Sequence, residues 1–276
     1  NRGLKLRCSA AKGYLNPVKK RKNLKIIVNA QVQKINFENN KAVSISYYEK
    51  DKLFNVEAKK EIILSAGSIG SPHLLQVSGI GDVIKLKNLG IDIVKNLKGV
   101  GKNLQDHLMF RPVYKVKNLK SLNKKINSFI GNSLIALEYI FKKSGPMTMG
   151  ASQVCGFVKS DPSRSTPNLQ FHVQPISTDI LGATKLHDFE GITPTVANVR
   201  PTSRGEINIV SKNINDNPKI KMNYLSTDDD RYVAAQGLKL VRKIMLETKT
   251  FKKYEPEEYR PGLHIQDDEE LVKAGS

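Results

Sequence analysis

The sequence predicts a chain of mixed α and β structure, with two domains of α+β or α/β character. Three observations lead to this prediction. Up to residue 66, short apolar runs separated by polar turns indicate a β-meander. A glycine turn and a helix follow within residues 67–77. The second half combines short strand-like runs, split by Pro and Gly, with an amphipathic helix at residues 228–247.

The first part of the chain predicts strands joined by tight turns. The expected strands are residues 24–28, 32–37, 42–48, 53–56 and 62–66, with turns at 38–41 and 49–52. The last strand, which is strongly apolar, ends on Gly67. A helix is expected at residues 72–77, with Ser71 as its N-cap and Pro72 at its first position.

A second helix is expected at residues 83–89, since Asp82 is a good N-cap and Gly90 suits the position after the last helical residue. Residues 91–94 then predict one more short strand. The strand, glycine turn and helix at residues 61–77 place bare backbone and unpaired N–H groups at one point. Such an arrangement can press a main chain against a flat or phosphorylated cofactor.

The second half predicts an antiparallel sheet backed by helices. The strand-like runs are residues 109–117, 152–158, 169–174, 193–199 and 205–211. A helix within residues 120–143 would place Leu134, Leu137, Ile140 and Phe141 on one side. The tail from residue 255 is acidic and then small and polar, and it gives no clear signal.

Composition excludes some function classes. The net charge is +19, but the lysines are spread along the chain, and the densest run, residues 19–22, has no aromatic residue to stack on bases. We therefore expect a solvated basic surface and no nucleic-acid partner. No apolar run approaches the roughly 20 residues that cross a bilayer, so no membrane span is expected.

Cysteine and histidine spacing gives no metal site. Cys8 and Cys155 form no CxxC motif and are expected to be buried free thiols, with a disulfide between them as the open alternative. The histidines show neither HExxH nor paired spacing, so no metal is assigned. They are His73, His107, His172, His187 and His264.

Several motifs together resemble one known family. Residues 67–81 read Gly-Ser-Ile-Gly-Ser-Pro-His-Leu-Leu-Gln-Val-Ser-Gly-Ile-Gly, which is similar to the second signature of the glucose-methanol-choline (GMC) flavoprotein oxidoreductases. Residues 7–24, 99–107, 200–205 and 218–230 resemble further passages of the same family. The resemblance covers nearly the whole chain, and within the family the sequence is most similar to the insect glucose-dehydrogenase-like branch.

The resemblance implies a partial two-domain GMC fold with FAD as cofactor. Residues 1–108 would be the middle section of a discontinuous FAD-binding domain, with the β-meander and short helices. Residues 109–276 would be most of the substrate domain, an antiparallel sheet backed by helices. The chain begins with Asn1 and is expected to be an internal piece of a longer protein, whose compartment stays open, secretion included.

Three residues are the expected cofactor contacts, all through the main chain. By resemblance, Val32 lies in a strand that touches the adenine end of FAD; as a plain core residue it would fit the strand equally well. Ala66 and Gly67 lie where a strand passes close to the flavin, and small residues are needed there because a larger side chain would push the ring away.

No catalytic residue is assigned. Alcohol oxidation needs a base with a pKa near working pH, which favours histidine, but the family's histidine lies in a segment that this sequence does not show. His107 follows Asp106 in a loop that it is expected to order, and neighbouring side chains usually diverge. A Ser/His/Asp hydrolase is not expected, because no G-x-S-x-G elbow occurs.

Two glycine pairs, Gly79/Gly81 and Gly99/Gly101, begin like a dinucleotide fingerprint but do not complete G-x-G-x-x-G, and both are interpreted as turns. The resemblance implies that the family's fingerprint lies near its N-terminus, so this sequence is expected to lack the part that holds the ADP moiety of FAD. The expected activity of the whole protein is oxidation of a CH–OH donor, an alcohol or a sugar, with hydride transfer to the flavin and with oxygen or a quinone as electron acceptor. Residues 1–276 alone are expected to be inactive. The alternative is a catalytically inactive GMC-fold binding or structural protein.

Overall fold

The computed structural model of the protein describes residues 8–150, 152–179 and 185–275. Arg7, the first residue of the upstream motif, lies outside them. The chain forms two compact units. The meander unit comprises residues 10–106 and 203–224; the six-stranded unit comprises Cys8, Ser9 and the described residues within 107–202 and 225–275. The assignment of residues 1–108 and 109–276 to a cofactor and a substrate domain stays a prediction.

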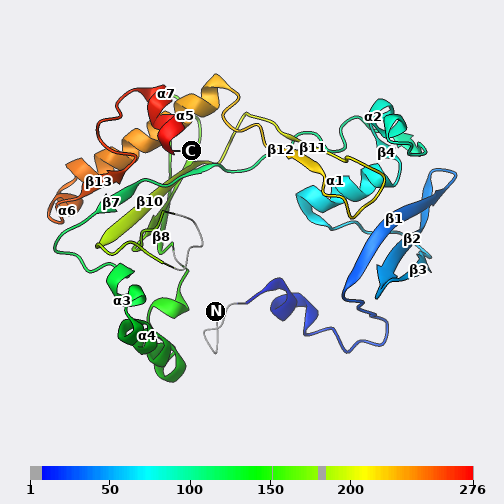
Figure 1. Cartoon of the computed structure of the whole chain (residues 1–276), viewed down its shortest axis with the longest axis horizontal. Coiled ribbons are helices and arrows are strands. Elements are labelled where there is room, and N and C mark those ends of the chain that lie inside the picture. Colours follow the sequence, from blue (N-terminus) through cyan, green and yellow to red (C-terminus); the bar gives the residue numbers. More distant parts are fainter. Residues whose placement is uncertain (1–7, 151, 180–184, 276) are drawn as a thin grey trace. The chain divides into compact units, whose positions relative to one another are not determined.

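The meander unit is built on a three-stranded antiparallel sheet (Figure 1). Its strands are β1 (Ala30–Glu38), β2 (Lys41–Glu49) and β3 (Lys52–Glu57). Both hairpins have two-residue turns in the left-handed region, the geometry that matches the twist of paired strands. The turn residues are Asn39, Asn40, Lys50 and Asp51. This part of the predicted meander is confirmed.

Two predicted strands of this unit are wrong. Residues 24–28 and 61–66, all of them described, form no strand. The second run stays largely accessible, and Ile63 is 78% exposed. An apolar run indicates burial, but a strand also needs a partner at hydrogen-bonding distance, and no described strand pairs with either run.

The helix of the glycine motif begins earlier than predicted. Helix α1 spans Gly67–Val77, so Pro72 lies inside it instead of at its first position. The Ser71 hydroxyl is not an N-cap; it accepts a hydrogen bond from the Ala66 N–H at 3.1 Å. Gly67 has φ +81°, and this left-handed residue turns the extended chain into the helix.

The rest of the meander unit follows α1. Helix α2 (Val83–Asn88) begins as predicted, with the Asp82 carboxylate accepting from two backbone N–H groups, and Gly90 follows it at φ +67°. Strand β4 (Ile80–Gly81) pairs in parallel with β5 (Lys95–Asn96), so the strand expected at 91–94 forms slightly further along. Strands β11 (Glu206–Asn208) and β12 (Lys219–Lys221) form a hairpin. A small core unites these segments; it contains Val77, Leu86, Ile91 and Ile209.

The other unit has an antiparallel sheet, as predicted, and the sheet has six strands. The strand predicted for it at residues 205–211 is wrong, because β11 pairs with β12 in the meander unit instead. Along the sheet the order is β13 (Glu257–Arg260), β7 (Val113–Lys115), β10 (Gly191–Asn198), β9 (Leu169–Gln174) and β8 (Val154–Val158), and β6 (Met109–Phe110) also pairs with β10. Every residue of β10 is buried, as befits a central strand. The chain tail gave no signal, yet it supplies β13 and a helix, α7 (Asp268–Gly275).

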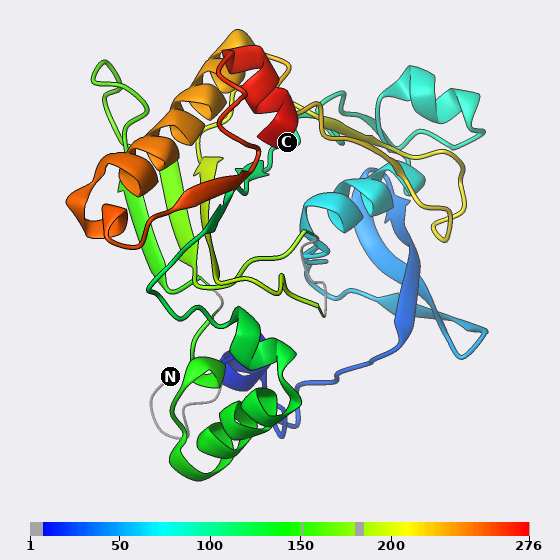
Figure 2. The same ribbon diagram turned by 60° about the vertical axis from the view of Figure 1, so that its left-hand side comes forward.

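Helices α5 (Asp228–Arg242) and α7 lie side by side against the sheet (Figures 1 and 2). Helix α5 continues through a π-helical turn, Lys243–Glu247, and a short α6 (Lys249–Lys252) follows, so the predicted helix at 228–247 is confirmed. A core of large apolar side chains joins sheet and helices. It includes Phe110, Tyr114, Leu169, Val196, Val233, Leu238, Met245 and Leu271.

The helix predicted within residues 120–143 is two helices, α3 (Asn123–Asn127) and α4 (Phe129–Lys142). The break lies at Ser128, which is extended (ψ 130°) and accepts a hydrogen bond from the Gly131 N–H at 3.3 Å as the N-cap of α4. A 3₁₀ turn, Pro146–Thr148, follows, and a π-helical turn, Ala11–Leu15, lies near the start of the chain.

The two cysteines are free, but both are exposed, so the expectation of burial is wrong. Cys155 lies on β8 at the edge of the sheet, where its sulfur accepts from the Gln170 amide at 3.3 Å. Every helix in the described ranges is too short or too polar to cross a bilayer. Across the same residues, His, Cys, Asp and Glu side chains nowhere gather in a group that could hold a metal ion.

Candidate cofactor site

The start of α1 has the open backbone that the sequence predicted. A Cβ built on Gly67 would meet no heavy atom within 4 Å, and Ala66, Gly67 and Ser68 are all exposed. Pro72 has no N–H, so it cannot donate the helical hydrogen bond to the Ser68 carbonyl. The first turn of α1 therefore has N–H groups without helical partners, beside the open backbone at Gly67.

Beside this turn lies a loop, residues 99–106, that is tied down by its backbone. Gly101 accepts from the Ile207 N–H at 2.6 Å, and Leu104 and Gly205 exchange two hydrogen bonds of 2.8 and 3.1 Å. Gly101 has φ +80°, and a Cβ there would lie 2.2 Å from the Ile207 carbonyl oxygen. Only glycine allows the loop to approach β11 this closely.

Gln76 joins the helix to the same strand. Its buried side-chain amide donates to the Ile207 carbonyl at 3.0 Å, and its carbonyl oxygen accepts from the Ile209 N–H at 3.3 Å. A polar residue within the apolar run of α1 was the signal in the sequence, and it was missed. The amide is satisfied by backbone groups, so Gln76 is a positioning residue for β11 and, through it, for the loop.

The turn and the loop enclose a cavity of about 290 Å³. It is lined by Ser68, Pro72, Gly101, Lys102, Asn103, Leu104, Gln105 and Ile207. A second cavity, of about 410 Å³, shares Lys102 and Asn103 with the first and extends to Arg204, Glu206, Lys221 and Asn223. Two predicted cofactor residues, Ala66 and Gly67, precede Ser68 directly. Val32 lies in β1, half-buried beside a bulge, and does not line either cavity.

Charge in the second cavity is partly neutralised. Lys102 forms an ion pair and hydrogen bond with Glu206, and the Lys85 ammonium lies 3.7 Å from the same carboxylate. The hydrogen bond from Lys102 is the main cause that lowers the pKa of Glu206 to about 2, and it raises the pKa of Lys102. Arg204 and Lys221 add to a surface that favours anionic groups.

The loop ends in a tyrosine–carboxylate contact. The Tyr224 hydroxyl donates to Asp106 Oδ2 at 2.6 Å, while the neighbouring His107 side chain is exposed. Burial, and then this hydrogen bond, raises the pKa of Tyr224 to about 12. Asp106 therefore serves to anchor the loop to Tyr224 and not to orient a histidine base.

His73 is the one histidine of α1, and it is buried. Its Nε2 has no hydrogen-bond partner, and burial lowers its pKa below the ordinary value of 6.5. Between the lowered pKa of the folded state and the ordinary value of 6.5, the imidazole is therefore neutral in the folded protein and protonated in the unfolded chain. The stability gained from a neutral His73 is complete above pH 6.5 and is lost as the pH falls toward the folded pKa.

We expect His73→Leu to reduce the loss of unfolding free energy between pH 8 and pH 5, by at most about 1.4 kcal/mol per pH unit. Urea titrations at several pH values measure this. His264→Gln, at an exposed histidine, is the control and should leave the pH dependence as in the unchanged protein. Equal pH slopes for His73→Leu and the unchanged protein would contradict the assignment.

A Ser-His-Asp constellation does occur in the six-stranded unit. Ser177 Oγ lies 3.0 Å from His187 Nδ1, and His187 Nε2 lies 3.1 Å from Asp179 Oδ1. However, Ser177 is fully buried, and its hydroxyl accepts from the Asn123 amide at 2.8 Å. A nucleophile without access to substrate cannot act, so the group stabilises the fold, and the sequence-based rejection of a hydrolase is not changed by it.

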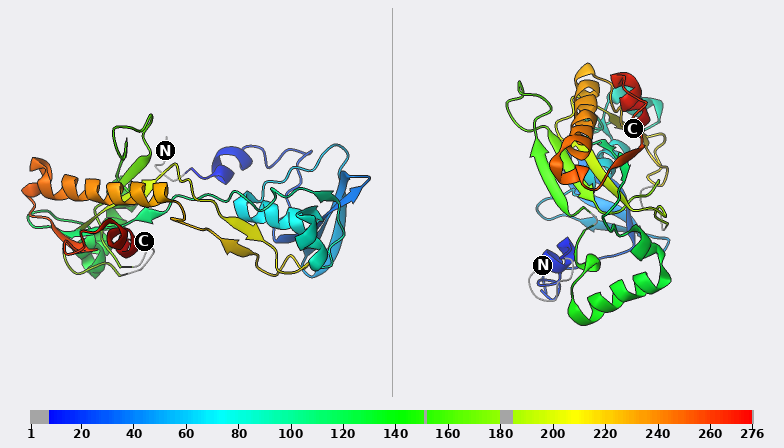
Figure 3. Two further views of the ribbon diagram at one scale, coloured as in Figure 1. Left: turned by 90° about the horizontal axis from the view of Figure 1, so that it is seen from above. Right: turned by 90° about the vertical axis from the view of Figure 1, so that its left-hand side faces the viewer.

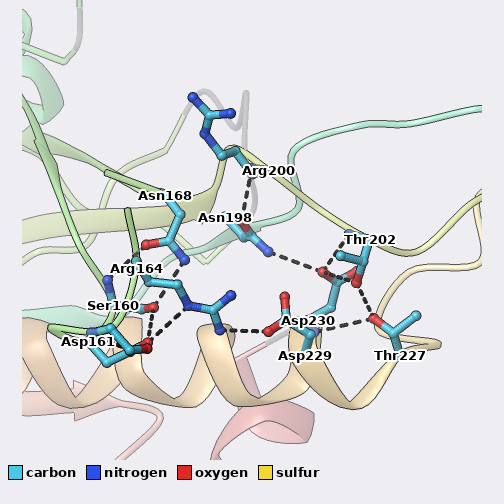
Figure 4. Close-up of polar contacts among 11 residues, drawn as sticks. Ser160, Asp161, Arg164, Asn168, Asn198, Arg200, Thr202, Thr227, Asp229 and Asp230 are labelled. Carbon is cyan, nitrogen blue, oxygen red and sulfur yellow. Dashed lines mark hydrogen bonds and ion pairs between the residues drawn. The ribbon is translucent and has the colours of Figure 1, made fainter. Parts of the chain in front are cut away.

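Two motifs of the resemblance meet at the start of α5 (Figure 4). Asp230 Oδ1 accepts hydrogen bonds from the Asn198 amide at 3.1 Å and from the Thr202 N–H at 2.8 Å. Thr227 caps the helix by accepting from the Asp230 N–H at 3.3 Å, and its hydroxyl lies 2.6 Å from that of Thr202. Thr202 of the motif at 200–205 and Asp230 of the motif at 218–230 therefore fix a helix end, and these two residues have a structural role here.

Arg164 extends this network to the loop after β8. Its guanidinium donates to Asp161 at 3.0 Å and to Asp229 at 2.6 Å (Figure 4). Hydrogen bonds from Ser163 first, then from Ser160 and Arg164, lower the pKa of Asp161 to about 2. These contacts hold the loop against the first turn of α5.

Comparison with known proteins agrees with these features. Sequence models described as GMC oxidoreductase match residues 3–109 and 201–275. The oxygen-dependent choline dehydrogenase of Pectobacterium carotovorum subsp. carotovorum is 37% identical over 267 residues, which are 96% of this chain and 47% of the relative. That of Staphylococcus xylosus is also 37% identical, over 97% of this chain and 47% of the relative. The chain spans about half the length of the curated relatives it matches.

Solved structures show the same fold. An FAD-dependent oxidoreductase from Chaetomium thermophilum superposes with a TM-score of 0.85, at 24% identity, over 98% of this chain and 53% of the other. Pyridoxine 4-oxidase from Mesorbium loti gives a TM-score of 0.79 at 23% identity, over 98% and 49%. The predicted partial two-domain GMC fold is confirmed, and the chain belongs to the GMC oxidoreductase family.

Proposed function

We propose that the whole protein containing this chain is an FAD-dependent oxidoreductase that oxidises a CH–OH donor. Membership of the family supports the reaction class, and the observation that carries the cofactor assignment is the open backbone at Ala66–Gly67. A flat ring can lie against a main chain that has no side chain above it. The alternative, an inactive GMC-fold protein, predicts a complete polypeptide without bound flavin.

In this proposal the chain holds the cofactor mainly through backbone groups. Ala66 and Gly67 would lie against the ring, the N–H groups at the start of α1 would face negative charge, and Val32 would contact the adenine end. When bound, FAD supplies the acceptor for the hydride that leaves the CH–OH carbon. No described residue is assigned as the catalytic base.

The substrate is proposed from the relatives. The bacterial relatives named above are called choline dehydrogenases, so a small alcohol such as choline is the first substrate to test. The narrower resemblance to the insect glucose-dehydrogenase-like branch found no support among them, and glucose is the second substrate. Reduction of a dye, oxygen or a quinone with each substrate distinguishes the donors and the acceptors. Poor FAD binding by residues 1–276 alone stays a prediction.

Gly67→Ala in the complete polypeptide is expected to lower the flavin content at least about tenfold, because a Cβ enters the space that the ring would fill. Gly90→Ala is the matched control. Gly90 also has a positive φ, and a Cβ there also meets nothing within 4 Å, so both variants carry the same backbone strain. The ratio of flavin to protein absorbance measures the difference. Equal flavin loss in both variants would refute the contact at Gly67.

A further inference from the structure

Helix α4 exposes an apolar face that its own unit leaves uncovered. The face consists of Phe129, Ile130, Leu134, Leu137, Ile140 and Phe141, which we call the apolar strip. Each of these side chains is between 47% and 88% exposed. At about 100° per residue they fall within an arc of about 140°, and Ser133 is the one polar residue inside it. Six large apolar side chains exposed together on one face of a helix mark an interaction site.

The opposite side of α4 fixes its orientation. Ile135 is buried, and a Cβ on Gly131 would lie 2.3 Å from the Lys125 carbonyl oxygen, so α3 and α4 touch through their backbones. Figures 2 and 3 show the two helices together at the end of the six-stranded unit that is opposite to α5 and α7. The strip therefore points outward because the other side of the helix is held.

Charge around the strip selects the occupant. Residues 117–150 contain six lysines and one glutamate, Glu138. Lys124 and Lys125 precede α4, Lys142 and Lys143 follow its apolar residues, and Glu138 accepts from Ser144 at 3.0 Å. A second copy would bring the same lysines against these, which disfavours a symmetric dimer. An apolar face with basic residues at both ends fits an anionic lipid surface.

We propose that α4 docks the protein on the surface of an anionic bilayer, with the apolar strip among the acyl chains and the lysines at the headgroups. The protein lies on the membrane and does not cross it. This inference is independent of the proposed oxidoreductase activity, because it rests on a surface outside the candidate cofactor site.

Vesicle sedimentation with the complete polypeptide tests it. We expect binding to vesicles of phosphatidylcholine with phosphatidylglycerol, weaker binding to phosphatidylcholine alone, and a decrease with salt. Phe129→Ser with Phe141→Ser should reduce binding at least about tenfold, since burial of the rings is lost. Lys124→Gln with Lys125→Gln should reduce it about tenfold on anionic vesicles only.

Two matched controls distinguish docking through α4 from nonspecific hydrophobic adsorption and from nonspecific electrostatic attraction. Ile84→Ser with Val210→Ser removes two exposed apolar side chains of the meander unit, and Lys19→Gln with Lys20→Gln removes two exposed lysines. Both should bind vesicles like the unchanged protein, and thermal melts confirm that all variants fold. Absence of binding, equal losses in controls and α4 variants, or a dimer that the phenylalanine variant dissociates without any change in vesicle binding would each overturn the proposal.

Discussion

Replacing Gly101 by alanine should lower the free energy of unfolding by about 2–5 kcal/mol, because the change combines left-handed backbone strain with a steric clash. The new Cβ would lie 2.2 Å from the Ile207 carbonyl oxygen and 2.6 Å from the Gln76 amide nitrogen. Neither atom can retreat cheaply, since one is backbone and the other is hydrogen-bonded to it. The loop 99–106 would leave β11, and the cavity beside α1 would open.

Gly99→Ala is the matched control in the same loop. Gly99 does not have a positive φ, and a Cβ there meets nothing within 4 Å, so the cost should stay below about 0.5 kcal/mol. Urea titration measures both stabilities. Hydrogen exchange locates the change, because the Ile207 N–H donates to Gly101 and should lose protection only in Gly101→Ala. Similar stability and protection in the two variants would show that the loop does not depend on this approach.

Local signals predicted the elements whose causes are local. The hairpin turns at Asn39–Asn40 and Lys50–Asp51 join strands in which apolar and polar residues alternate. Asp82 and Gly90 mark the two ends of α2, as expected. The strand predicted at residues 61–66 does not form, because a strand needs a partner and no described strand pairs with this run. The predicted start of α1 was wrong, because Pro72 suits the first position of a helix but lies inside α1.

The candidate site depends on contacts that the sequence does not reveal. Gln76 and Ile207 lie 131 residues apart and meet only because α1 packs on β11. The bare backbone at Gly67 was predictable from its motif, but the sequence did not show that the loop 99–106 lies beside it or that Tyr224 anchors this loop through Asp106. The apolar strip on α4 shows the same limit. Helical periodicity predicted one shared face for Leu134 and Phe141, but it could not show that this face is exposed.

The second large effect concerns a buried ion pair that joins α5 to β13. The Glu258 side chain is fully buried, and Arg242 donates to both of its oxygens, at 2.9 and 2.8 Å. The Tyr114 hydroxyl and the Gly262 N–H donate to the same carboxylate at 2.9 and 3.1 Å. Burial, and then the nearby carboxylate, raises the pKa of Tyr114, so the phenol stays a donor.

Arg242→Met should cost about 3–5 kcal/mol, because it leaves a buried carboxylate without its cation. Lys117→Met is the control in the same unit, since Lys117 and Glu255 form an exposed ion pair at 2.9 Å, and its loss should cost less than about 1 kcal/mol. The double variant Arg242→Met with Glu258→Met should recover part of the loss, because no unpaired charge remains inside. Denaturant titration of the three variants measures these differences. If Arg242→Met cost no more than Lys117→Met, the carboxylate would have to find another partner or a proton. The attachment of β13 to the helix would then depend on apolar packing alone.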